Sequence, residues 1–294
     1  MAIATLIAAG RLARQDIDAA AAAIADAGGT AAAPEWLDEG DACDLPFAGL
    51  TAEAARAALE GLSPGVDVVV QPAEGRAKRL LLADMDSTMI TIECIDELAD
   101  YAGIKSQVAE ITERAMRGEL DFEGALDARV KLLAGLDAAV IDRCREERVT
   151  LMPGARTLVR TMRAAGARAV LVSGGFTAFT DAVAAAIGFH RAVANVLDIA
   201  GGRLAGTVQR PIVGAETKRQ TLLAEAQALG IPAASVLAVG DGANDIPMIR
   251  EAGLGVAYHA KPATAAAAGA RIDHGDLTAL LWAQGYRRRD WATD

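Results

Sequence analysis

Two carboxylates and two hydroxyls follow an apolar run near residue 80. The stretch LLLADMDST (80–88) predicts a buried strand that ends on Asp84, with Asp86 two residues later. An unbroken apolar run is typical of parallel sheets, whose strands are covered on both faces. Carboxylates at such a strand end can bind a cation, attack an electrophile or transfer a proton. An ordinary Asp-rich turn is the alternative.

Small and polar residues also follow two later predicted strands, ARAVLVSGG (167–175) and ASVLAVGDGAND (234–245). Ligands of open parallel sheets bind outside the carboxyl ends of the strands. We therefore expect several groups to gather at one sheet edge. Beyond the first strand, these groups are Ser173, Gly174, Asp241, Asn244 and Asp245.

These motifs occur in the order found in the haloacid dehalogenase (HAD) superfamily of phosphatases, which the sequence resembles. The pattern DxDx[TV] is matched at residues 84–88, and a strand-end hydroxyl is matched by Ser173. Lys218, which opens a predicted helix, matches the third motif, and the acidic loop at 240–245 matches the fourth. The resemblance implies an α/β fold, a Rossmann-like core with a mostly parallel sheet.

Longer segments resemble the phosphoserine phosphatase family within this superfamily. They are DMDSTMITIECIDELADYAG (84–103), VSGGF (172–176) and VGDGANDIPMIREAGLGVAYHAKP (239–262), and the likeness extends over about residues 79–280. Residues at about 95–150 are charged, amphipathic and helical in pattern, which indicates a helical insertion. By resemblance this insertion is a cap over the active site.

The resemblance assigns the reaction to two aspartates and a metal ion. Asp84 is expected to attack phosphorus and become an aspartyl phosphate. Asp86 is expected to protonate the serine oxygen as it leaves, and later to accept a proton from water. Mg²⁺ is the expected cofactor, held by Asp84, Asp241 and the backbone carbonyl of Asp86, because a phosphate dianion must be neutralised before a carboxylate can attack it.

The remaining core motifs are expected to hold the phosphate. Ser173, Lys218 and the amide near Gly174 can bind oxygens on which negative charge gathers. Asn244 fits a contact with the phosphate or with Lys218. Asp245 is expected behind them, where it orients Lys218 or a metal-bound water.

Substrate selection requires partners for an ammonium and a carboxylate. By resemblance, Glu93 binds the ammonium, Arg129 the carboxylate, and Phe122 closes the apolar side. Arginine can grip a carboxylate through two parallel hydrogen bonds, which lysine cannot. The alternative is that Glu93 and Arg129 lie on a solvated helix face.

We therefore expect an enzyme that hydrolyses O-phosphoserine to serine, the last step of serine biosynthesis. Two alternatives remain open. One is a phosphotransferase that passes the phosphoryl group to homoserine, and the other is an amino-acid sensor with a vestigial phosphatase site. A homodimer is also left open.

Residues 1–78 are expected to form a separate domain, which resembles the ACT-like regulatory domains of this family. Strands are predicted at both ends and two helices between them, but PEWLDEGDACDLPFAG (34–49) is predicted to be acidic and irregular. A packing unit without a ligand is the alternative. PAEGRAK (72–78) has linker composition, so residues 79–294 would form the HAD phosphatase domain.

Bulk composition argues against several functions. The net charge of −10 and the pI near 4.9 disfavour nucleic-acid binding, which requires a basic face. No apolar run approaches the roughly 18 residues of a membrane helix. Three dispersed cysteines and a poor signal peptide indicate the cytoplasm. The only basic cluster, Arg287–Arg289, is expected to be a solvated end.

Overall fold

The computed structural model describes residues 1–117 and 119–292, which form two main sheets. Its N-terminal part contains β1 (Ala2–Ile7), α1 (Arg14–Asp26), β2 (Thr30–Ala31), β3 (Glu35–Asp38), β4 (Ala42–Ala48), α2 (Ala52–Leu59) and β5 (Asp67–Pro72). No helix among the described residues is both long and apolar enough to cross a bilayer.

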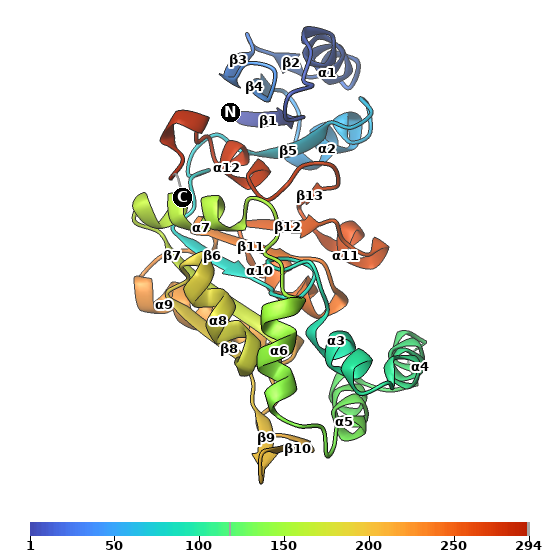
Figure 1. The fold of residues 1–294 in the computed structure, drawn as a ribbon. Helices are drawn as coiled ribbons and strands as arrows, with labels where there is room; N and C mark the ends of the chain where they lie inside the picture. The colour runs from blue at the N-terminus through green and yellow to red at the C-terminus, as the bar shows by residue number, and fades with distance from the viewer. Residues whose placement is uncertain (118, 293–294) are drawn as a thin grey trace.

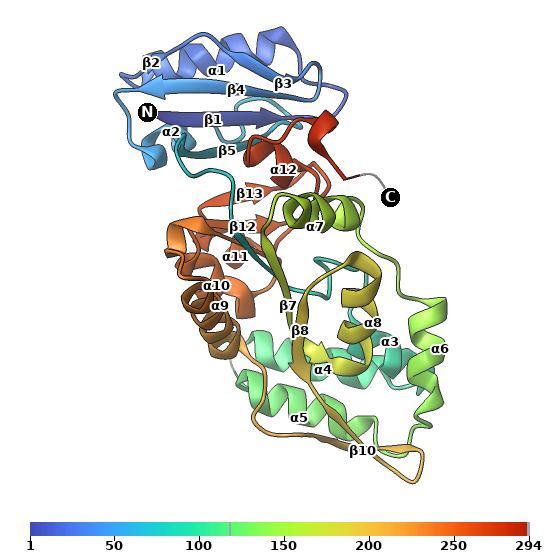
Figure 2. The ribbon, with the colours of Figure 1, turned by 90° about the vertical axis from the view of Figure 1, so that its left-hand side faces the viewer.

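The N-terminal sheet is antiparallel, in the order β2-β4-β1-β5, with β3 also paired to β4. With its two helices it has the order β-α-β-β-β-α-β, which is one strand more than the β-α-β-β-α-β order of ferredoxin-like units. One sheet face packs on α1 and α2 through residues such as Leu6, Leu45 and Ile24. The other face lies toward the C-terminal part of the chain (Figure 2). The ACT-like assignment stays a prediction.

The expectation of irregular structure over 34–49 is wrong, because this segment contributes β3 and β4. Leu37, Leu45 and Phe47 are buried there. Asp44 is buried as well. Its charge is compensated, because Thr5 donates to its Oδ1 at 2.8 Å and Arg76 pairs with its Oδ2 at 2.6 Å. Because these partners are distant in the sequence, the acidic composition of residues 34–49 does not indicate strands.

The second sheet has six parallel strands in the order β13-β12-β11-β6-β7-β8. They are β6 (Leu80–Ala83), β7 (Arg168–Phe176), β8 (Arg191–Asn195), β11 (Val236–Gly240), β12 (Leu254–Tyr258) and β13 (Ala270–Ile272). Helices α7 (Ala155–Ala164), α8 (Thr177–Ile187), α9 (Ala215–Leu229), α10 (Ile246–Glu251), α11 (Pro262–Ala267) and α12 (Ala279–Ala283) surround it. Short 3₁₀ turns occur at η1 (Ala233–Ser235), η2 (Ala243–Asp245) and η3 (Arg288–Asp290).

The strand order explains where the polar motifs meet. β6 lies between β7 and β11, and all three run parallel, so their carboxyl ends lie side by side. Every residue of β6 is fully buried, as its apolar run predicts. The predicted mostly parallel α/β core is confirmed. The antiparallel sheet lies within residues 2–72, and we propose the domain boundary near residue 78.

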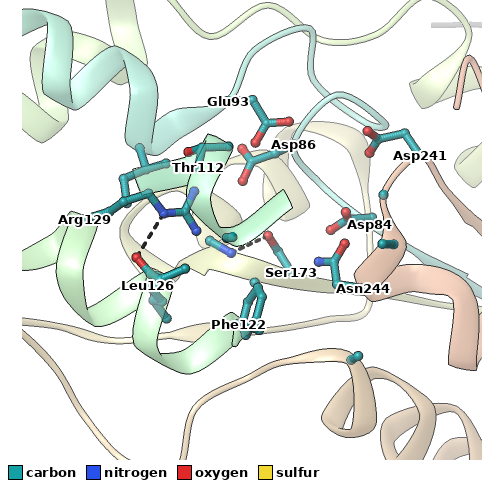
Figure 3. A pocket seen from close by; sticks show the side chains of 18 of the residues that line it. Asp84, Asp86, Glu93, Thr112, Phe122, Leu126, Arg129, Ser173, Asp241 and Asn244 are labelled. Carbon is teal, nitrogen blue, oxygen red and sulfur yellow. Dashed lines mark hydrogen bonds between the residues drawn. The ribbon is translucent and has the colours of Figure 1, made fainter. Parts of the chain in front are cut away.

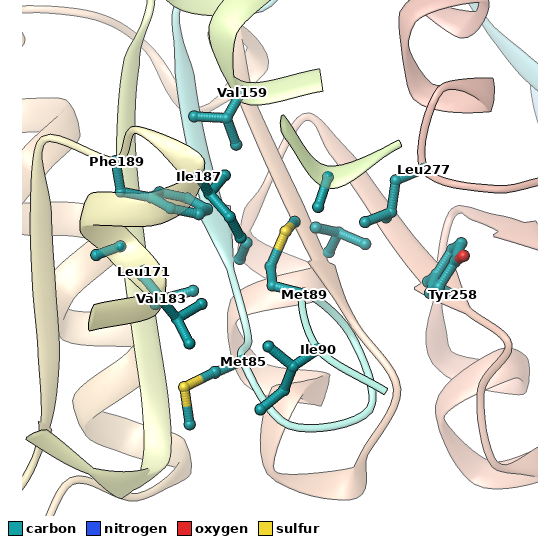
Figure 4. Packing of buried hydrophobic residues seen from close by; sticks show 14 of the residues in the cluster. Met85, Met89, Ile90, Val159, Leu171, Val183, Ile187, Phe189, Tyr258 and Leu277 are labelled. Carbon is teal, nitrogen blue, oxygen red and sulfur yellow. The ribbon is translucent and has the colours of Figure 1, made fainter. Parts of the chain in front are cut away.

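Apolar side chains of the loop after β6 hold this loop in the hydrophobic core. Met85, Met89 and Ile90 are fully buried in the cluster that also contains Leu171 and Val183 (Figure 4). Polar residues of the same loop can therefore face the sheet edge while the alternate side chains hold the loop in the core.

Four helices are inserted between β6 and α7, as expected for residues at about 95–150 (Figure 1). They are α3 (Cys94–Tyr101), α4 (Lys105–Met116), α5 (Phe122–Leu132) and α6 (Ala139–Glu147). The predicted hairpin, β9 (Leu197–Ala200) and β10 (Arg203–Val208), packs on α5. Gly206, which has no side chain, leaves room for Ala134 just after α5. Arg210 adds ion pairs to Glu123 at 3.1 Å and Asp127 at 2.5 Å.

The expectation of a solvated C-terminal arginine cluster is wrong for Arg287, whose side chain is 31% exposed, whereas Arg288 is more than half exposed although it is paired. Arg287 pairs with Glu35 at 2.5 Å, and Arg288 pairs with Asp41 at 2.6 Å. Arg288 also lies near the rings of Trp282 and Trp291, at 5.4 and 5.3 Å from their centroids. These contacts join the C-terminal segment to the N-terminal sheet. Arg289 remains mostly exposed.

Gly255 in β12 generates the first prediction. A Cβ at this position would lie 1.9 Å from the carbonyl oxygen of Ile249, so strand and helix α10 would have to separate. Gly255→Ala should lower the free energy of unfolding by about 1–3 kcal/mol, the usual range for overpacking. Urea denaturation measures this change.

Gly269→Ala is the matched control, because the nearest atom to its added Cβ lies at an ordinary 3.7 Å. Equal stabilities of the two variants would contradict the packing described for β12 and α10.

Candidate active site

A cavity of about 480 Å³ lies where the ends of β6, β7 and β11 face the inserted helices (Figure 3). It contains nine of the predicted site residues, seven from the core and the loop before α3, and two from α5. They are Asp84, Asp86, Glu93, Ser173, Gly174, Asp241 and Asn244, together with Phe122 and Arg129. The two other predicted residues, Lys218 and Asp245, lie directly behind Asp84.

Lys218 is fully buried between two carboxylates. Its Nζ lies 2.7 Å from Asp84 Oδ1 and 2.6 Å from Asp245 Oδ1. Burial alone would lower the pKa of the Lys218 ammonium, but Asp245 and Asp84 outweigh burial and raise it above its ordinary value. The lysine is therefore a fixed positive charge at the end of β6.

Asp245 has both oxygens occupied within the protein. Oδ1 accepts from Lys218, and Oδ2 accepts from the backbone N–H of Gly242 at 3.0 Å. Gly240 leaves the space that this carboxylate fills, because a Cβ there would lie 2.3 Å from Asp245 Cγ. Asp245 thus contacts Lys218 directly, and its role in orienting this lysine stays a prediction.

The donor set of the site suits a hard divalent cation. Carboxylate oxygens of Asp84, Asp241 and Asp245 all lie within 4.8 Å of one another. Burial, followed by repulsion from Asp84 and Glu93, raises the pKa of Asp241 to about 6, which shows negative charge in excess. A cation would relieve this repulsion, and oxygen ligands favour Mg²⁺, Ca²⁺ or Mn²⁺.

Asp84 and Asp241 are the better pair of metal ligands, because both line the cavity whereas Asp245 is fully buried behind it and bonded through both oxygens. Thr88 supports Asp241 by donating its hydroxyl to Oδ1 at 3.3 Å. The predicted third ligand, the carbonyl of Asp86, stays a prediction.

Asp86 and Glu93 form an acidic pair at the start of the cap. Asp86 Oδ1 accepts from the N–H of Cys94 at 3.2 Å, and Glu93 Oε1 accepts from the Ser87 hydroxyl at 2.7 Å. Ser87 holds this position with a left-handed φ of 56°. Burial, followed by repulsion from Glu93, raises the pKa of Asp86 to about 8.

The Ser173 hydroxyl is oriented by its own loop. Its Oγ accepts from the N–H of Gly175 at 2.8 Å, which leaves the hydroxyl proton free to donate to a ligand. Gly174 lies between the core and the cap, since a Cβ there would lie 3.0 Å from Phe122 Cζ and 3.5 Å from Asn244 Nδ2. The glycine thus lets the backbone approach whatever occupies the pocket.

Arg129 brings a cation from α5 to the acidic side of the pocket (Figure 3). Its Nε donates to the Ala125 carbonyl at 3.2 Å, which orients the guanidinium. Burial lowers the pKa of Arg129, while Asp96 and Glu93 counteract that change. The solvated-face alternative is therefore not supported for Arg129, because the side chain is half-buried and lines the cavity.

Several lining residues were not predicted. The cap adds Ile95, Thr112, Leu120 and Leu126, and the core adds Lys261, which follows β12 at the same sheet edge. Lys261 could have been found by extending the strand-end rule to the fourth strand. The apolar cap residues carry no such signal, because amphipathic helices bury similar side chains wherever they pack.

The strand order and the placement of the acidic motifs define the family. Residues 78–253 match the family model of haloacid dehalogenase-like hydrolases, and the chain belongs to this family. It is similar to a phosphoserine phosphatase of Streptomyces coelicolor, with 46% identity over 253 residues, covering 85% of this chain and 62% of that protein.

Two further relatives extend the comparison. A phosphoserine phosphatase of a Polaromonas species is 46% identical over 227 residues, which cover 75% of this chain and 96% of the relative. The crystal structure of a probable phosphoserine phosphatase from Vibrio cholerae superposes with a TM-score of 0.78 and 33% identity, covering 98% of this chain and 88% of the other. That likeness includes the N-terminal sheet.

The buried lysine generates a prediction about stability. Lys218→Met should leave Asp84 and Asp245 facing each other without a cation, and breaking a buried ion pair in this way costs about 3–5 kcal/mol. Urea denaturation in a metal-free buffer at pH 7.5 should therefore show a large loss in the free energy of unfolding.

Lys261→Met is the control, because this exposed lysine lines the same pocket. It should lose less than about 1 kcal/mol, as exposed charges do. A Lys218→Met protein as stable as the control would rule out the buried charge triad.

Proposed function

We propose that this chain hydrolyses O-phosphoserine to serine and inorganic phosphate, with Mg²⁺ as its metal ion. One observation carries the proposal. A single cavity brings the phosphate-handling sheet edge, with Asp84, Ser173 and Asp241, against Arg129 and Glu93 of the cap. Phosphate, carboxylate and ammonium are the three charged groups of O-phosphoserine. The phosphoserine phosphatases of Streptomyces coelicolor and Polaromonas, both 46% identical, support the assignment.

In this proposal Asp84 is the nucleophile. A carboxylate oxygen of Asp84 bonds to phosphorus while the bond from phosphorus to the serine oxygen breaks, which leaves an aspartyl phosphate. Lys218 fixes the orientation of Asp84 through the 2.7 Å ion pair. When bound between Asp84 and Asp241, Mg²⁺ would neutralise charge on the phosphate so that the carboxylate can approach.

Asp86 transfers the protons. It lies in the same cavity as Asp84, and its Oδ1 is anchored by the Cys94 amide. A serine alkoxide is a poor leaving group, so Asp86 donates a proton to the departing oxygen. The resulting carboxylate then accepts a proton from the water that attacks the aspartyl phosphate. Asp84 is regenerated, and inorganic phosphate leaves.

The phosphoryl oxygens are held by groups that are already oriented. Ser173 has a free hydroxyl proton, Lys218 carries a fixed positive charge, and Asn244 lies beside Gly174. Donors that are positioned before the reaction stabilise charge without reorganising. The serine part of the substrate would meet Arg129 through its carboxylate and Glu93 through its ammonium, with Phe122 on the apolar side.

Two further assignments belong to this proposal. We place the enzyme in the cytoplasm, because Cys43, Cys94 and Cys144 are all buried free thiols, which suits a reducing compartment. A homodimer stays a prediction.

Phosphate release from a panel of phosphoamino acids and sugar phosphates tests the activity. We expect O-phosphoserine to be the preferred substrate, with turnover that chelation abolishes and Mg²⁺ restores. Asp84→Asn should retain the fold and lose all turnover, because an amide cannot attack phosphorus. Asp181→Asn, an exposed aspartate on α8, is the control and should keep full activity.

Three outcomes would contradict the proposal. A sugar phosphate as the best substrate would overturn the amino-acid specificity. Phosphohomoserine formed when homoserine is added would indicate a phosphotransferase. Activity retained in Asp84→Asn would remove the assigned nucleophile.

Arg129 tests whether the cap selects the substrate. Arg129→Ala should leave the substrate carboxylate unpaired in a closed site, at a cost of about 2–5 kcal/mol, or roughly thirty-fold to several thousand-fold in kcat/KM for O-phosphoserine. Arg129→Lys should recover only part of the loss, because the two-pronged contact is absent.

The comparison substrate is p-nitrophenyl phosphate, which has no carboxylate and should be hydrolysed about equally by wild type and variants. Equal losses on both substrates would mean that Arg129 supports the fold or the chemistry instead of selectivity.

A further inference from the structure

Asn195 is a buried amide that none of the roles above uses. It is the last residue of β8 and is only 2% exposed. Its side chain makes three hydrogen bonds, all to backbone groups of other segments. Nδ2 donates to the carbonyls of Gly174 at 2.9 Å and Val213 at 3.3 Å, and Oδ1 accepts from the N–H of Val213 at 2.7 Å.

The first of these bonds fixes the peptide that orients Ser173. The Gly174–Gly175 peptide donates its N–H to Ser173 Oγ, and its carbonyl accepts from Asn195. The peptide is thus held at both ends. If it rotated, the Ser173 hydroxyl would lose the donor that directs its proton into the pocket. Asp86 lies against the same peptide, since a Cβ on Gly175 would lie 2.7 Å from Asp86 Oδ2.

The other two bonds fix the approach to Lys218. Val213 precedes Gly214, which is the N-cap of α9, and the Gly214 carbonyl accepts the N–H of Lys218 at 3.0 Å. Lys218 therefore lies one helical turn beyond the backbone that Asn195 holds. Asn195 spans the Ser173 loop and the start of the Lys218 helix.

The same two backbone segments also support the cap. Phe122 Cζ lies 3.0 Å from the Cβ position of Gly174, and Phe122 Cδ1 lies 3.2 Å from that of Gly214. The aromatic ring thus rests on both glycines that Asn195 brings together, at the bottom of the pocket in Figure 3. A shift between the two segments would therefore move Ser173, Lys218 and the two glycines that contact Phe122 together.

We infer that Asn195 is a positioning residue for phosphoryl transfer, which sets the Ser173 hydroxyl and the Lys218 ammonium at the spacing that the phosphoryl group requires. The inference rests on the proposed function only for its phosphoryl chemistry, and it is independent of which amino acid is recognised. A misplacement near 1 Å can cost about 100-fold in rate, so a side chain that fixes this spacing acts on the chemical step.

Asn195→Asp tests the role with a side chain of the same size. It places an oxygen against the two carbonyls in place of Nδ2, so both donated bonds are lost. We expect kcat to fall by about 10- to 100-fold, equally for O-phosphoserine and p-nitrophenyl phosphate, while KM for O-phosphoserine changes by less than about threefold. The inhibition constant of orthovanadate, which mimics the phosphoryl group in transfer, should rise by a similar factor.

Asn195→Ser is the second variant, for the case that the aspartate variant does not fold. Its hydroxyl is too short to span both segments, so the same loss is expected. Gly255→Ala is the control for reduced stability, because it lies outside the pocket, and it should keep wild-type kcat at a temperature where it is folded.

Each outcome decides the question. A folded Asn195→Asp protein with kcat and vanadate inhibition within about twofold of wild type overturns the inference, and so does an equal loss in Gly255→Ala. If neither Asn195 variant folds, Asn195 serves stability and the positioning role is rejected. If wild type cleaves p-nitrophenyl phosphate but not O-phosphoserine, the proposed substrate fails while the comparison on the aryl phosphate still decides the role of Asn195. If wild type cleaves neither, both fail.

Discussion

The site depends on one interaction, the pairing of the buried Lys218 ammonium with the carboxylates of Asp84 and Asp245. Burying one positive and two negative groups is costly, and the cost is offset only when all three are held in good geometry. Residues around these three groups must therefore meet geometric requirements as well. Gly240 must lack a side chain so that Asp245 fits, the Gly242 amide must hold the second oxygen of Asp245, and α9 must begin at a fixed place. The carboxyl edge of the sheet is therefore held in place by these contacts, and we propose that selectivity comes from the helices that cover it.

Much of this sheet edge could be predicted from the sequence, for a physical reason. Strands covered on both faces require unbroken apolar runs, and LLLA at 80–83 and VLAVG at 236–240 provide them. Residues that follow such runs must lie at one sheet edge when the strands are parallel. That rule predicts Asp84, Ser173 and Asp241 at one edge, and the strand order β11-β6-β7 agrees with it.

The features that could not be predicted depend on partners distant in the chain. Asp44 is expected in an irregular segment because its partners Arg76 and Thr5 are distant in the chain. The ion pairs of Arg287 with Glu35 and of Arg288 with Asp41 give no signal in the sequence for the same reason. β8 is an edge strand in which only Asn195 is fully buried, so RAVAN at 191–195 lacks the unbroken apolar run of a central strand. Asn195 carries no local signal at all, because its three partners belong to segments 18 to 21 residues away.

The contacts between the C-terminal segment and the N-terminal sheet have a consequence for biosynthesis. The sheet face that carries Ile7, Leu37 and Val69 shares its apolar cluster with Leu280 and Trp282, and Gln71 bonds to the carbonyl of Ala283. About 200 residues separate β5 from α12, which covers this face. Translating these residues takes on the order of 10–40 s at common ribosomal rates. Throughout that interval the nascent chain presents an uncovered apolar sheet. The sheet is thus made well before the segment that shields it, and this face is where a chaperone would find the emerging polypeptide.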